Sequence, residues 1–264
     1  HAATLLAFAL HNVSLGQRWA AAGHFPAVGL RDTVTFLAWA VVLVLLLVHA
    51  ATRVEALGLV ALPVAFVLVL VAALTPPSGR VDPQLQSAFL PIHATLAFLG
   101  SATLFLAFAM GALYLIQERE LRARAPRVFY YLAPSLGRCD AIGGASATVG
   151  LTLLTLAMVS GMLWSHAARH VYFSGSPKEW SALTAWLLYV VLVFVRLRSG
   201  WGGRRAALLA ILAFPAVLFV FAWLTLTGSG DVTCSTGLIP AAACASMNFL
   251  SASGMSVCLR SLAL

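Results

Sequence analysis

The stretch ALGLVALPVAFVLVLVAAL, residues 56–74, contains no charged side chain and is long enough to cross a bilayer. A membrane-spanning helix needs about 20 mostly apolar residues. Five further runs share this property, and a shorter one precedes them all: the five are 33–50, 88–116, 141–164, 180–195 and 206–227, and the shorter one is 2–10. The sequence therefore predicts a polytopic membrane protein.

The composition supports the same class of protein. Apolar residues make up 61% of the 264 positions and charged residues only 9%, which leaves too little polar surface for a soluble globule. Unbroken apolar runs favour helices, because the strands of a membrane barrel alternate in polarity over roughly 10 residues. We expect an all-α transmembrane helical bundle of seven or eight spans with short outward loops.

The basic residues predict which way the bundle faces. The net charge of +8 lies in the loops between the apolar runs, so it indicates topology and predicts no nucleic-acid partner. Ten arginines fall on one side of the membrane: Arg53, Arg119, Arg122, Arg124, Arg127, Arg138, Arg196, Arg198, Arg204 and Arg205. The positive-inside rule places that side in the cytoplasm of a bacterial-type inner membrane. His24, His93 and residues 165–179 then face outward.

The organisation of the chain follows from these runs. Residues 1–227 are predicted to form the transmembrane bundle, and residues 228–264 an irregular tail in which 238–259 is a candidate eighth span. The chain begins at His1 after no methionine, and we expect a processed end or a partial first span there. Between residues 117 and 140, the Glu118/Arg122 spacing predicts that the preceding helix continues for a short distance.

Recognisable catalytic patterns are missing from the sequence. Its four cysteines match no redox or zinc spacing, and no phosphate-binding glycine loop, nucleophile elbow or carboxylate pair lies within a span. A binding role is therefore favoured over bond-making catalysis.

Histidines are the ionisable residues that remain. Four map to the outward side: His24, His93, His166 and His170. Neutral imidazole is a good ligand for haem iron and other transition metals, and two imidazoles from neighbouring segments can form an axial pair. His93 is predicted near the outer end of the fourth apolar run, and His166 and His170 in the loop after the fifth. For His11 and His49, at the ends of spans, anchoring at the membrane interface is the favoured explanation.

Several separated motifs together resemble a known family. They occur in one register over roughly residues 18–226: Arg18-Trp19 with Gly23-His24-Phe25-Pro26 and Phe36-Leu37-Ala38-Trp39, then Leu90-Pro91-Ile92-His93-Ala94, Tyr114-Leu115-Ile116-Gln117-Glu118-Arg119, Leu153-Leu154-Thr155-Leu156, and Ser160-Gly161 with Trp164. In this order they resemble the cytochrome c assembly proteins of the CcsA/CcmC/HemX type.

The resemblance implies haem handling at the outer face of the membrane. Members of the family present haem to apocytochrome c or to a haem chaperone, with histidines on the iron and a tryptophan-rich loop against the porphyrin. By resemblance, His93 is the axial ligand of the haem iron. Trp164, Tyr172 and Phe173 are expected to contact the macrocycle, and His24 to shape the outer surface. Membrane lipid is the other expected partner.

This chain also departs from the family pattern in its outer loop. Arg169, Phe173 and Gly175 stand where the family carries tryptophan, and Phe194 stands where it usually carries histidine. A flat aromatic surface is what a haem edge needs, and glycine provides none.

Three hypotheses follow from these departures. In the first, a rewired haem site pairs His93 with His166, His170 or His24. In the second, a haem-free homologue acts as a scaffold or accessory subunit of a larger membrane complex, and small residues such as Gly100 and Gly143 either contact other membrane subunits or pack the protein's own bundle. A transporter, suggested by prolines within spans, is the third.

Overall fold

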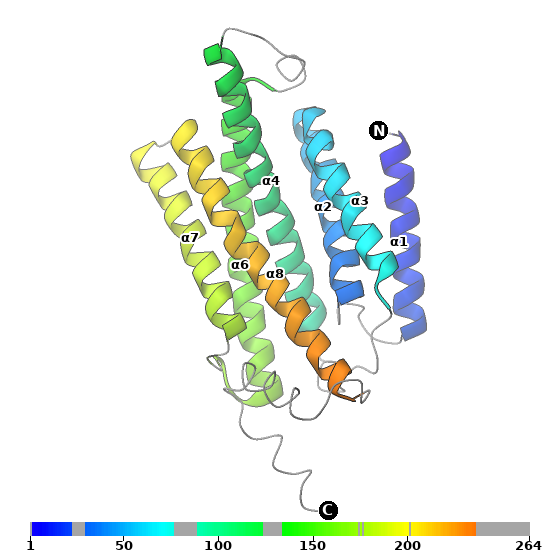
Figure 1. Ribbon diagram of the computed structural model, residues 1–264. Helices are drawn as coiled ribbons and strands as arrows, with labels where there is room; N and C mark the ends of the chain where they lie inside the picture. Colours follow the sequence, from blue (N-terminus) through cyan, green and yellow to red (C-terminus); the bar gives the residue numbers. More distant parts are fainter. Residues whose placement is uncertain are drawn as a thin grey trace, which may run out of the picture.

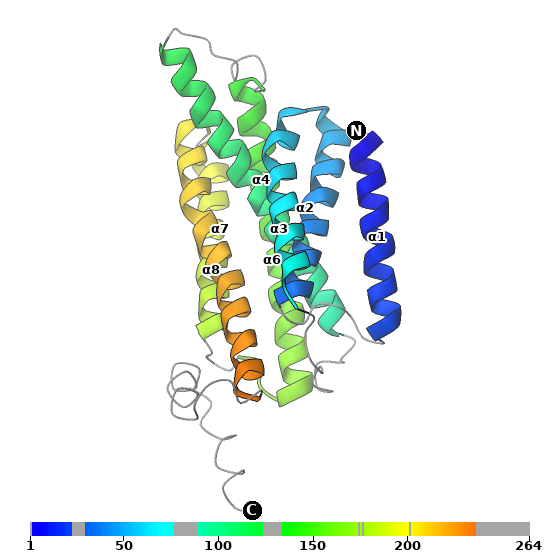
Figure 2. The same ribbon diagram turned by 45° about the vertical axis from the view of Figure 1, so that its right-hand side comes forward.

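A computed structural model describes residues 2–22, 30–76, 89–123, 134–173, 175, 177–200 and 202–235. Within these residues the protein is all-helical, and the described part of each charge-free run lies inside one helix (Figures 1 and 2). The seven helices are α1 (Ala2–Ala22), α2 (Leu30–Thr52), α3 (Ala56–Leu74), α4 (Phe89–Ala123), α6 (Leu136–Arg169), α7 (Pro177–Ser199) and α8 (Arg204–Ser235). The predicted fold class is confirmed.

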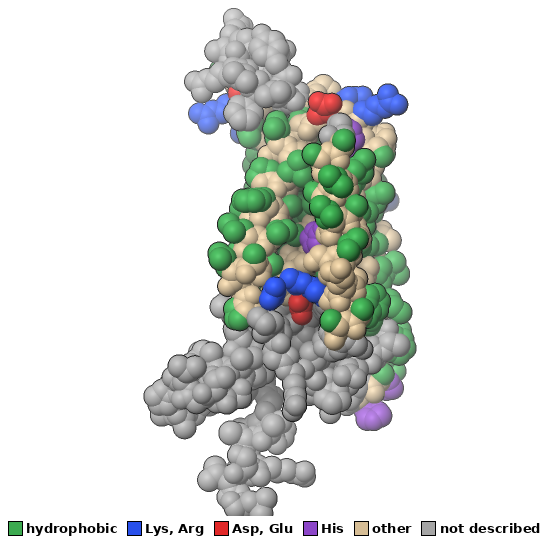
Figure 3. All heavy atoms as spheres, turned by 90° about the vertical axis from the view of Figure 1, so that its right-hand side faces the viewer, with side chains coloured by type: hydrophobic (Ala, Val, Ile, Leu, Met, Phe, Trp, Pro, Cys, Tyr) green, Lys and Arg blue, Asp and Glu red, His purple; other side chains and the backbone are tan. Residues whose placement is uncertain are grey.

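Five of these helices are long and apolar enough to cross a membrane, by length and composition: α2, α3, α4, α6 and α7. Large apolar side chains such as Phe66 and Leu212 are exposed on the outside of the bundle. Figure 3 shows apolar side chains over much of one such face. Exposed apolar residues on long helices are expected where lipid replaces water as the solvent. The exact number of spans stays a prediction.

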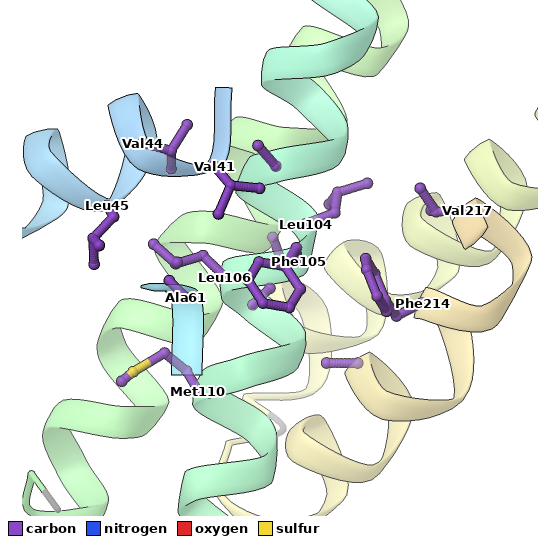
Figure 4. Close-up of a cluster of buried hydrophobic side chains, with 14 of the residues drawn as sticks. Val41, Val44, Leu45, Ala61, Leu104, Phe105, Leu106, Met110, Phe214 and Val217 are labelled. Carbon is purple, nitrogen blue, oxygen red and sulfur yellow. The ribbon is translucent and has the colours of Figure 1, made fainter. Parts of the chain in front are cut away.

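Helix α4 forms the centre of the bundle. It packs along α6 over most of its length and also contacts α2 and α8, while α3 packs against α2 and α7 packs against α8 (Figures 1 and 2). Figure 4 shows the apolar cluster that results, in which α4 contributes Leu104, Phe105, Leu106 and Met110. Phe105 meets Phe214 of α8 with 5.8 Å between ring centroids. The core therefore lies along α4.

Small residues let the helices around α4 approach closely. A Cβ atom added at Gly100 would lie 3.2 Å from the backbone nitrogen of Leu154 on α6. One added at Gly111 would lie 3.0 Å from the carbonyl oxygen of Ala207 on α8. Gly143 lies against Met110 in the same way, with a Cβ distance of 3.3 Å. These glycines therefore pack the protein's own bundle, which was one of the two uses that the sequence left open.

The first helix differs from its prediction. Helix α1 runs on to Ala22, so its 21 residues span about 31 Å, close to the thickness of a bilayer core. His11 thus lies halfway along α1 and not at the end of a span, which corrects the expectation. The polar half of α1 is held by α2: the Trp39 indole donates to Asn12 Oδ1 at 3.0 Å, and Phe8 stacks on Trp39 with 6.2 Å between ring centroids.

At the other end of the bundle, α4 continues past its apolar run to Ala123, as predicted. Arg122 donates to Glu118 Oε1 at 2.8 Å, one turn back on the same helix. Helix α8 crosses the predicted boundary at residue 227 and continues to Ser235. Residues 236–264 lie outside the described part of the chain, so the irregular tail and the candidate eighth span stay predictions.

Three segments meet at Asp140 in the first turns of α6, at the predicted cytoplasmic end. Arg196 of α7 donates from Nη1 to Asp140 Oδ1 and from Nη2 to Oδ2, both at 2.9 Å, and also to the Asp140 carbonyl oxygen at 2.8 Å. The backbone nitrogen of Gly203, next to α8, donates to Oδ1 at 2.8 Å. A Cβ atom at Gly144 would overlap the Arg196 guanidinium. This joint fixes the relative positions of α6, α7 and α8.

Candidate functional site

His93 lies in the second turn of α4 and points toward α6. Its Nδ1 is 2.7 Å from the carbonyl oxygen of Ala157, on a helix 64 residues away in sequence. Because a carbonyl oxygen only accepts, Nδ1 carries the ring proton and donates it, and the lone pair of the neutral ring lies on Nε2. A histidine whose Nδ1 is held by a backbone carbonyl is oriented in the way that protein ligands of metals usually are.

Two neighbouring residues of α6 make this contact achievable. A Cβ atom at Gly161 would lie 2.8 Å from both Cε1 and Nδ1 of His93, so any larger residue would push the ring away from Ala157. Ser160 Oγ donates to the same Ala157 carbonyl oxygen at 2.9 Å. The Ser160-Gly161 pair was part of the family resemblance, and the structure gives it a physical role. Gly161 leaves room for the His93 ring, and Ser160 binds the same carbonyl oxygen as the ring does.

Trp164 lies beside His93, one turn after Gly161 on α6. The two rings stack with 6.3 Å between centroids and 18° between planes. The Trp164 Nε1 atom is buried, and it has no hydrogen-bond acceptor among the described residues. By contrast, Trp186 on α7 donates its indole proton to Thr155 Oγ1 at 2.9 Å. A buried indole donor without an acceptor costs free energy, so it is a place where a bound acceptor would be favourable.

A small cavity adjoins this group. Its volume is about 80 Å³, and its walls come from four helices: His93 and Ala97 of α4, Leu154, Ala157 and Met158 of α6, Ala182 and Ala185 of α7, and Val217 of α8. Sites that enclose small molecules usually measure about 300–1,000 Å³. A macrocycle therefore does not fit into the cavity beside His93, and a large ligand of His93 would have to lie at the surface.

The other predicted histidines form a separate group. His166 lies in the last turns of α6 and not in the following loop, because α6 continues to Arg169. It stacks on Tyr172 with 4.2 Å between ring centroids and meets His170 edge-on at 6.2 Å. His170 ends α6 in a left-handed conformation, with φ of 59°. His166, His170 and Tyr172 thus form one aromatic group at the predicted outward end.

Helix geometry separates this group from His93. Gly161 and Trp164 lie on the face of α6 that contacts His93. At 100° per residue, His166 is about 140° around the helix from Gly161 and about 7 Å further along it. The structure therefore brings Trp164 to His93 but does not bring His166 to the same face.

The start of α7 carries the remaining aromatic residues. Phe173 meets Trp180 edge-on with 5.3 Å between centroids, and both rings are exposed. Gly175 has φ of 71°, a conformation that a tryptophan would adopt only with strain, and its nitrogen donates to Glu179 Oε2 at 2.9 Å. The loss of the family's tryptophan at this position therefore coincides with a tight turn that requires glycine.

The two remaining positions from the sequence are His24 and Phe194. His24 lies outside the described residues, so its role stays a prediction. Phe194 of α7, where family members usually carry histidine, has 62% of its surface exposed. That position faces away from the bundle core, and its substitution does not alter the surroundings of His93. Among the described residues no group of three or more histidine, cysteine or acidic side chains converges as a metal site.

Comparison with curated proteins gives distant relatives over most of the chain. Cytochrome c biogenesis protein CcsA of Prochlorococcus marinus strain MIT 9301 is 29% identical over 251 residues, which cover 86% of this chain and 81% of that protein. The protein of the same name from Guillardia theta is 26% identical over 250 residues, covering 87% of this chain and 83% of its own. CcsA of Chlamydomonas reinhardtii is 28% identical over 221 residues, covering 81% of this chain and 62% of its own.

A family model decides the assignment. The model described as "Cytochrome C assembly protein" matches residues 27–230, well over half of the sequence. This range includes α2 to α7 and most of α8, and therefore both the His93 group and the His166 group. It also agrees with the resemblance that the sequence motifs indicated. The chain is thus a multi-pass membrane protein that belongs to the cytochrome c assembly protein family.

Proposed function

We propose that this protein binds haem at the outward end of its bundle, with His93 as an axial ligand, and presents it for cytochrome c assembly. The observation that carries the proposal is the way in which α6 holds the His93 ring. The Ala157 carbonyl fixes the ring's tautomer and orientation, and Gly161 gives the ring room to reach that carbonyl. Haem is the cargo of this function, and apocytochrome c or a haem chaperone would receive it.

The surroundings of His93 supply further support. Trp164 stacks beside it and offers a buried indole proton that lacks an acceptor among the described residues. The aromatic rings of Tyr172 and Phe173 are exposed at the same end of α6, where an apolar macrocycle edge would gain contact area. Because the internal cavity is small, the proposed position of haem is the surface of the bundle.

The second axial ligand is proposed to come from the outer histidines. His24, His166 and His170 are the candidates, as the sequence indicated. His166 is the least favoured of the three on geometry, because it projects from a different face of α6 than the one that meets His93. His170 lies where α6 ends, in a left-handed conformation that turns the chain away from the helix, and it is the favoured described candidate.

A haem-free scaffold is the second candidate function, and one observation favours it. The cavity next to His93 holds only about 80 Å³, so the described residues form no ready-made pocket for a macrocycle beside His93. In that role His93 would be a buried structural residue that joins α4 to α6 through the Ala157 carbonyl. Contacts to other membrane subunits would then be the function.

Haem content after purification in detergent distinguishes the two. The experiment compares the wild type, His93→Ala and a matched control, His49→Ala, by absorbance spectrum and a haem assay after reconstitution. His49 is a suitable control because its Nδ1 also lies near a backbone carbonyl, 3.4 Å from Val54 O, at the opposite end of the bundle. Near-stoichiometric haem in the wild type and the control, and loss in His93→Ala, is expected. Absence of haem from all three would favour the scaffold.

Presentation is tested separately from binding. Haem-loaded protein is mixed with an apocytochrome c peptide that contains a Cys-x-x-Cys-His segment under reducing conditions, and transfer of haem absorbance to the peptide is followed. The proposal expects transfer that depends on His93. Stable retention of haem by the membrane protein, with no transfer, would contradict presentation while leaving binding intact.

A further inference from the structure

A cleft separates α1 from α2 and α3, on the side of the bundle away from the His93 group. Its volume is about 760 Å³, within the range of about 300–1,000 Å³ typical of ligand sites. Figure 3 shows this side of the molecule, where basic and acidic side chains meet toward one edge and a histidine lies further in, among apolar side chains. The cleft owes its size to the loose packing of α1, whose contacts are mainly with α2.

The mouth of the cleft is positively charged. Arg18 and Arg31 both line it, near the end of α1 and the start of α2. Asp32 Oδ1 is 3.8 Å from Arg18 Nη1. The Nε atom of the half-buried Arg31 is itself buried and has no hydrogen-bond partner among the described residues. A buried guanidinium nitrogen without an acceptor is a place where a bound anion would be favourable.

Polarity declines in steps from this mouth. Ser14 and Thr35 line the cleft four residues from Arg18 and Arg31, about 6 Å deeper at 1.5 Å per residue. His11 follows, about 10 Å from Arg18 along α1. Beyond these residues the walls are apolar except for Thr4 near the start of α1: Ala3, Ala7, Phe8 and Leu10 on α1, Ala38 and Val42 on α2, and Leu62, Ala65, Phe66 and Val69 on α3.

Two of the three walls of the cleft have the length of one leaflet of a bilayer. From Arg31 to Val42 the wall of α2 measures about 16 Å, and from Leu62 to Ala73 the wall of α3 measures about the same, whereas the wall of α1 from Ala3 to Arg18 is longer, about 22 Å. Half of a hydrocarbon core of about 30 Å is about 15 Å. A charged mouth, a band of weaker polar groups and an apolar channel of this length correspond in order to the phosphate, the ester groups and an acyl chain of a glycerophospholipid.

We propose that this cleft is a binding site for one anionic phospholipid of the outer leaflet, with its phosphate held by Arg18 and Arg31 and an acyl chain between α1 and the wall that α2 and α3 form. The inference does not depend on haem binding, since it concerns a different face and different helices. Occupancy by lipid would fill a space that otherwise leaves α1 weakly attached to the bundle, and it would supply the acceptor that Arg31 Nε lacks.

The test measures phospholipid retained after detergent purification from vesicles of equal phosphatidylglycerol and phosphatidylcholine. Wild type is expected to retain phosphatidylglycerol selectively, near one molecule per chain. Arg31→Gln is expected to retain about fivefold less, the factor that one arginine beside an anionic headgroup contributes. The control is Arg198→Gln, an exposed arginine at the opposite end of the bundle, which should retain as much as the wild type.

A second pair of variants tests the apolar part without altering charge. Ala7→Trp places a large ring in the channel, whereas Leu6→Trp adds the same ring to an exposed position next to it that does not line the cleft. Only Ala7→Trp is expected to lose the lipid. If both retain it equally, or if phosphatidylcholine is retained as well as phosphatidylglycerol, the proposal is wrong.

Competition identifies the source of the anion. Inorganic phosphate at millimolar concentration should not displace the retained phosphatidylglycerol, because it lacks an acyl chain. Displacement by phosphate would reduce the site to an anion site and overturn the lipid assignment. A helix of another polypeptide recovered at unit stoichiometry, with no phospholipid, would overturn it too.

Discussion

The two ends of α6 differ in whether their polar groups have hydrogen-bond partners. At the predicted cytoplasmic end, Asp140 accepts from Arg196 and from the backbone of Gly203, and the whole joint is paired. At the predicted outward end, Trp164 has a buried donor without an acceptor among the described residues, and the rings of Tyr172 and Phe173 are exposed. The hydrogen bonds of Asp140 hold α6, α7 and α8 together at the first end. At the second end, a ligand would gain contacts with the unpaired Trp164 donor and the exposed rings.

Breaking the paired end should have the largest effect on stability. Arg196→Ala leaves the half-buried Asp140 carboxylate without its two-nitrogen partner, at an expected cost of about 2–4 kcal/mol. The measurement is the thermal unfolding temperature in detergent, which should fall by about 5 °C or more. Arg198→Ala, two residues further along α7 and exposed, is the control and should unfold like the wild type. Equal unfolding temperatures for the two variants would show that the joint is unimportant.

A change at Gly161 should damage the outward end next most strongly. In Gly161→Ala the added Cβ displaces the His93 ring from the Ala157 carbonyl, at an expected cost of about 1–3 kcal/mol, with a marked loss of haem. The control is Gly137→Ala on the same helix, where an added Cβ meets nothing within 4 Å. Haem titration and thermal unfolding of both variants check the prediction, and undiminished haem binding by Gly161→Ala would contradict it.

Removing the unpaired indole donor should have a smaller effect, and it should not destabilise the protein. Trp164→Phe keeps an aromatic ring beside His93 but removes the donor. The free energy of unfolding of the haem-free protein should therefore stay the same or rise by up to about 1 kcal/mol. Haem affinity should fall at the same time. If stability drops while affinity stays constant, the indole proton is satisfied within the folded chain and offers nothing to a ligand.

His166→Ala should have the smallest effect of the series. It removes the stack on the exposed Tyr172, a contact of about 1 kcal/mol or less. Because His166 lies on another face of α6 than Trp164, the absorbance spectrum of the haem-loaded protein should not change. A spectral change from six-coordinate to five-coordinate iron would instead identify His166 as the second axial ligand and would require the end of α6 to rearrange.

The sequence predicted the helices well because charge-free runs of this length have few alternatives to a spanning helix. It missed the second half of α1, where His11, Asn12 and Arg18 interrupt the apolar pattern. That half is helical through a tertiary contact, the Asn12–Trp39 hydrogen bond, which leaves no local signal. For the same reason the sequence placed His11 at the end of a span and not in the cleft.

The candidate site was predictable in part. His93 and Trp164 were identified by the chemistry of their side chains and by resemblance, and they do lie together. The Ala157 carbonyl was not predictable, since every residue has one, although Ser160-Gly161 marked its position. The sequence predicted His166 in a loop because the apolar run stops at Trp164. In the structure α6 continues to Arg169, so His166 is helical and its position around the helix axis separates it from His93.

The most direct test of the central claim, that His93 is the iron ligand, is chemical rescue. His93→Gly is purified and reconstituted with haem in the presence and absence of imidazole, with His49→Gly as the control. The account predicts that His93→Gly binds little haem alone and that added imidazole restores binding and the wild-type absorbance bands, since the free base would replace the missing side chain at the iron. Wild-type haem binding by His93→Gly without imidazole would contradict the account.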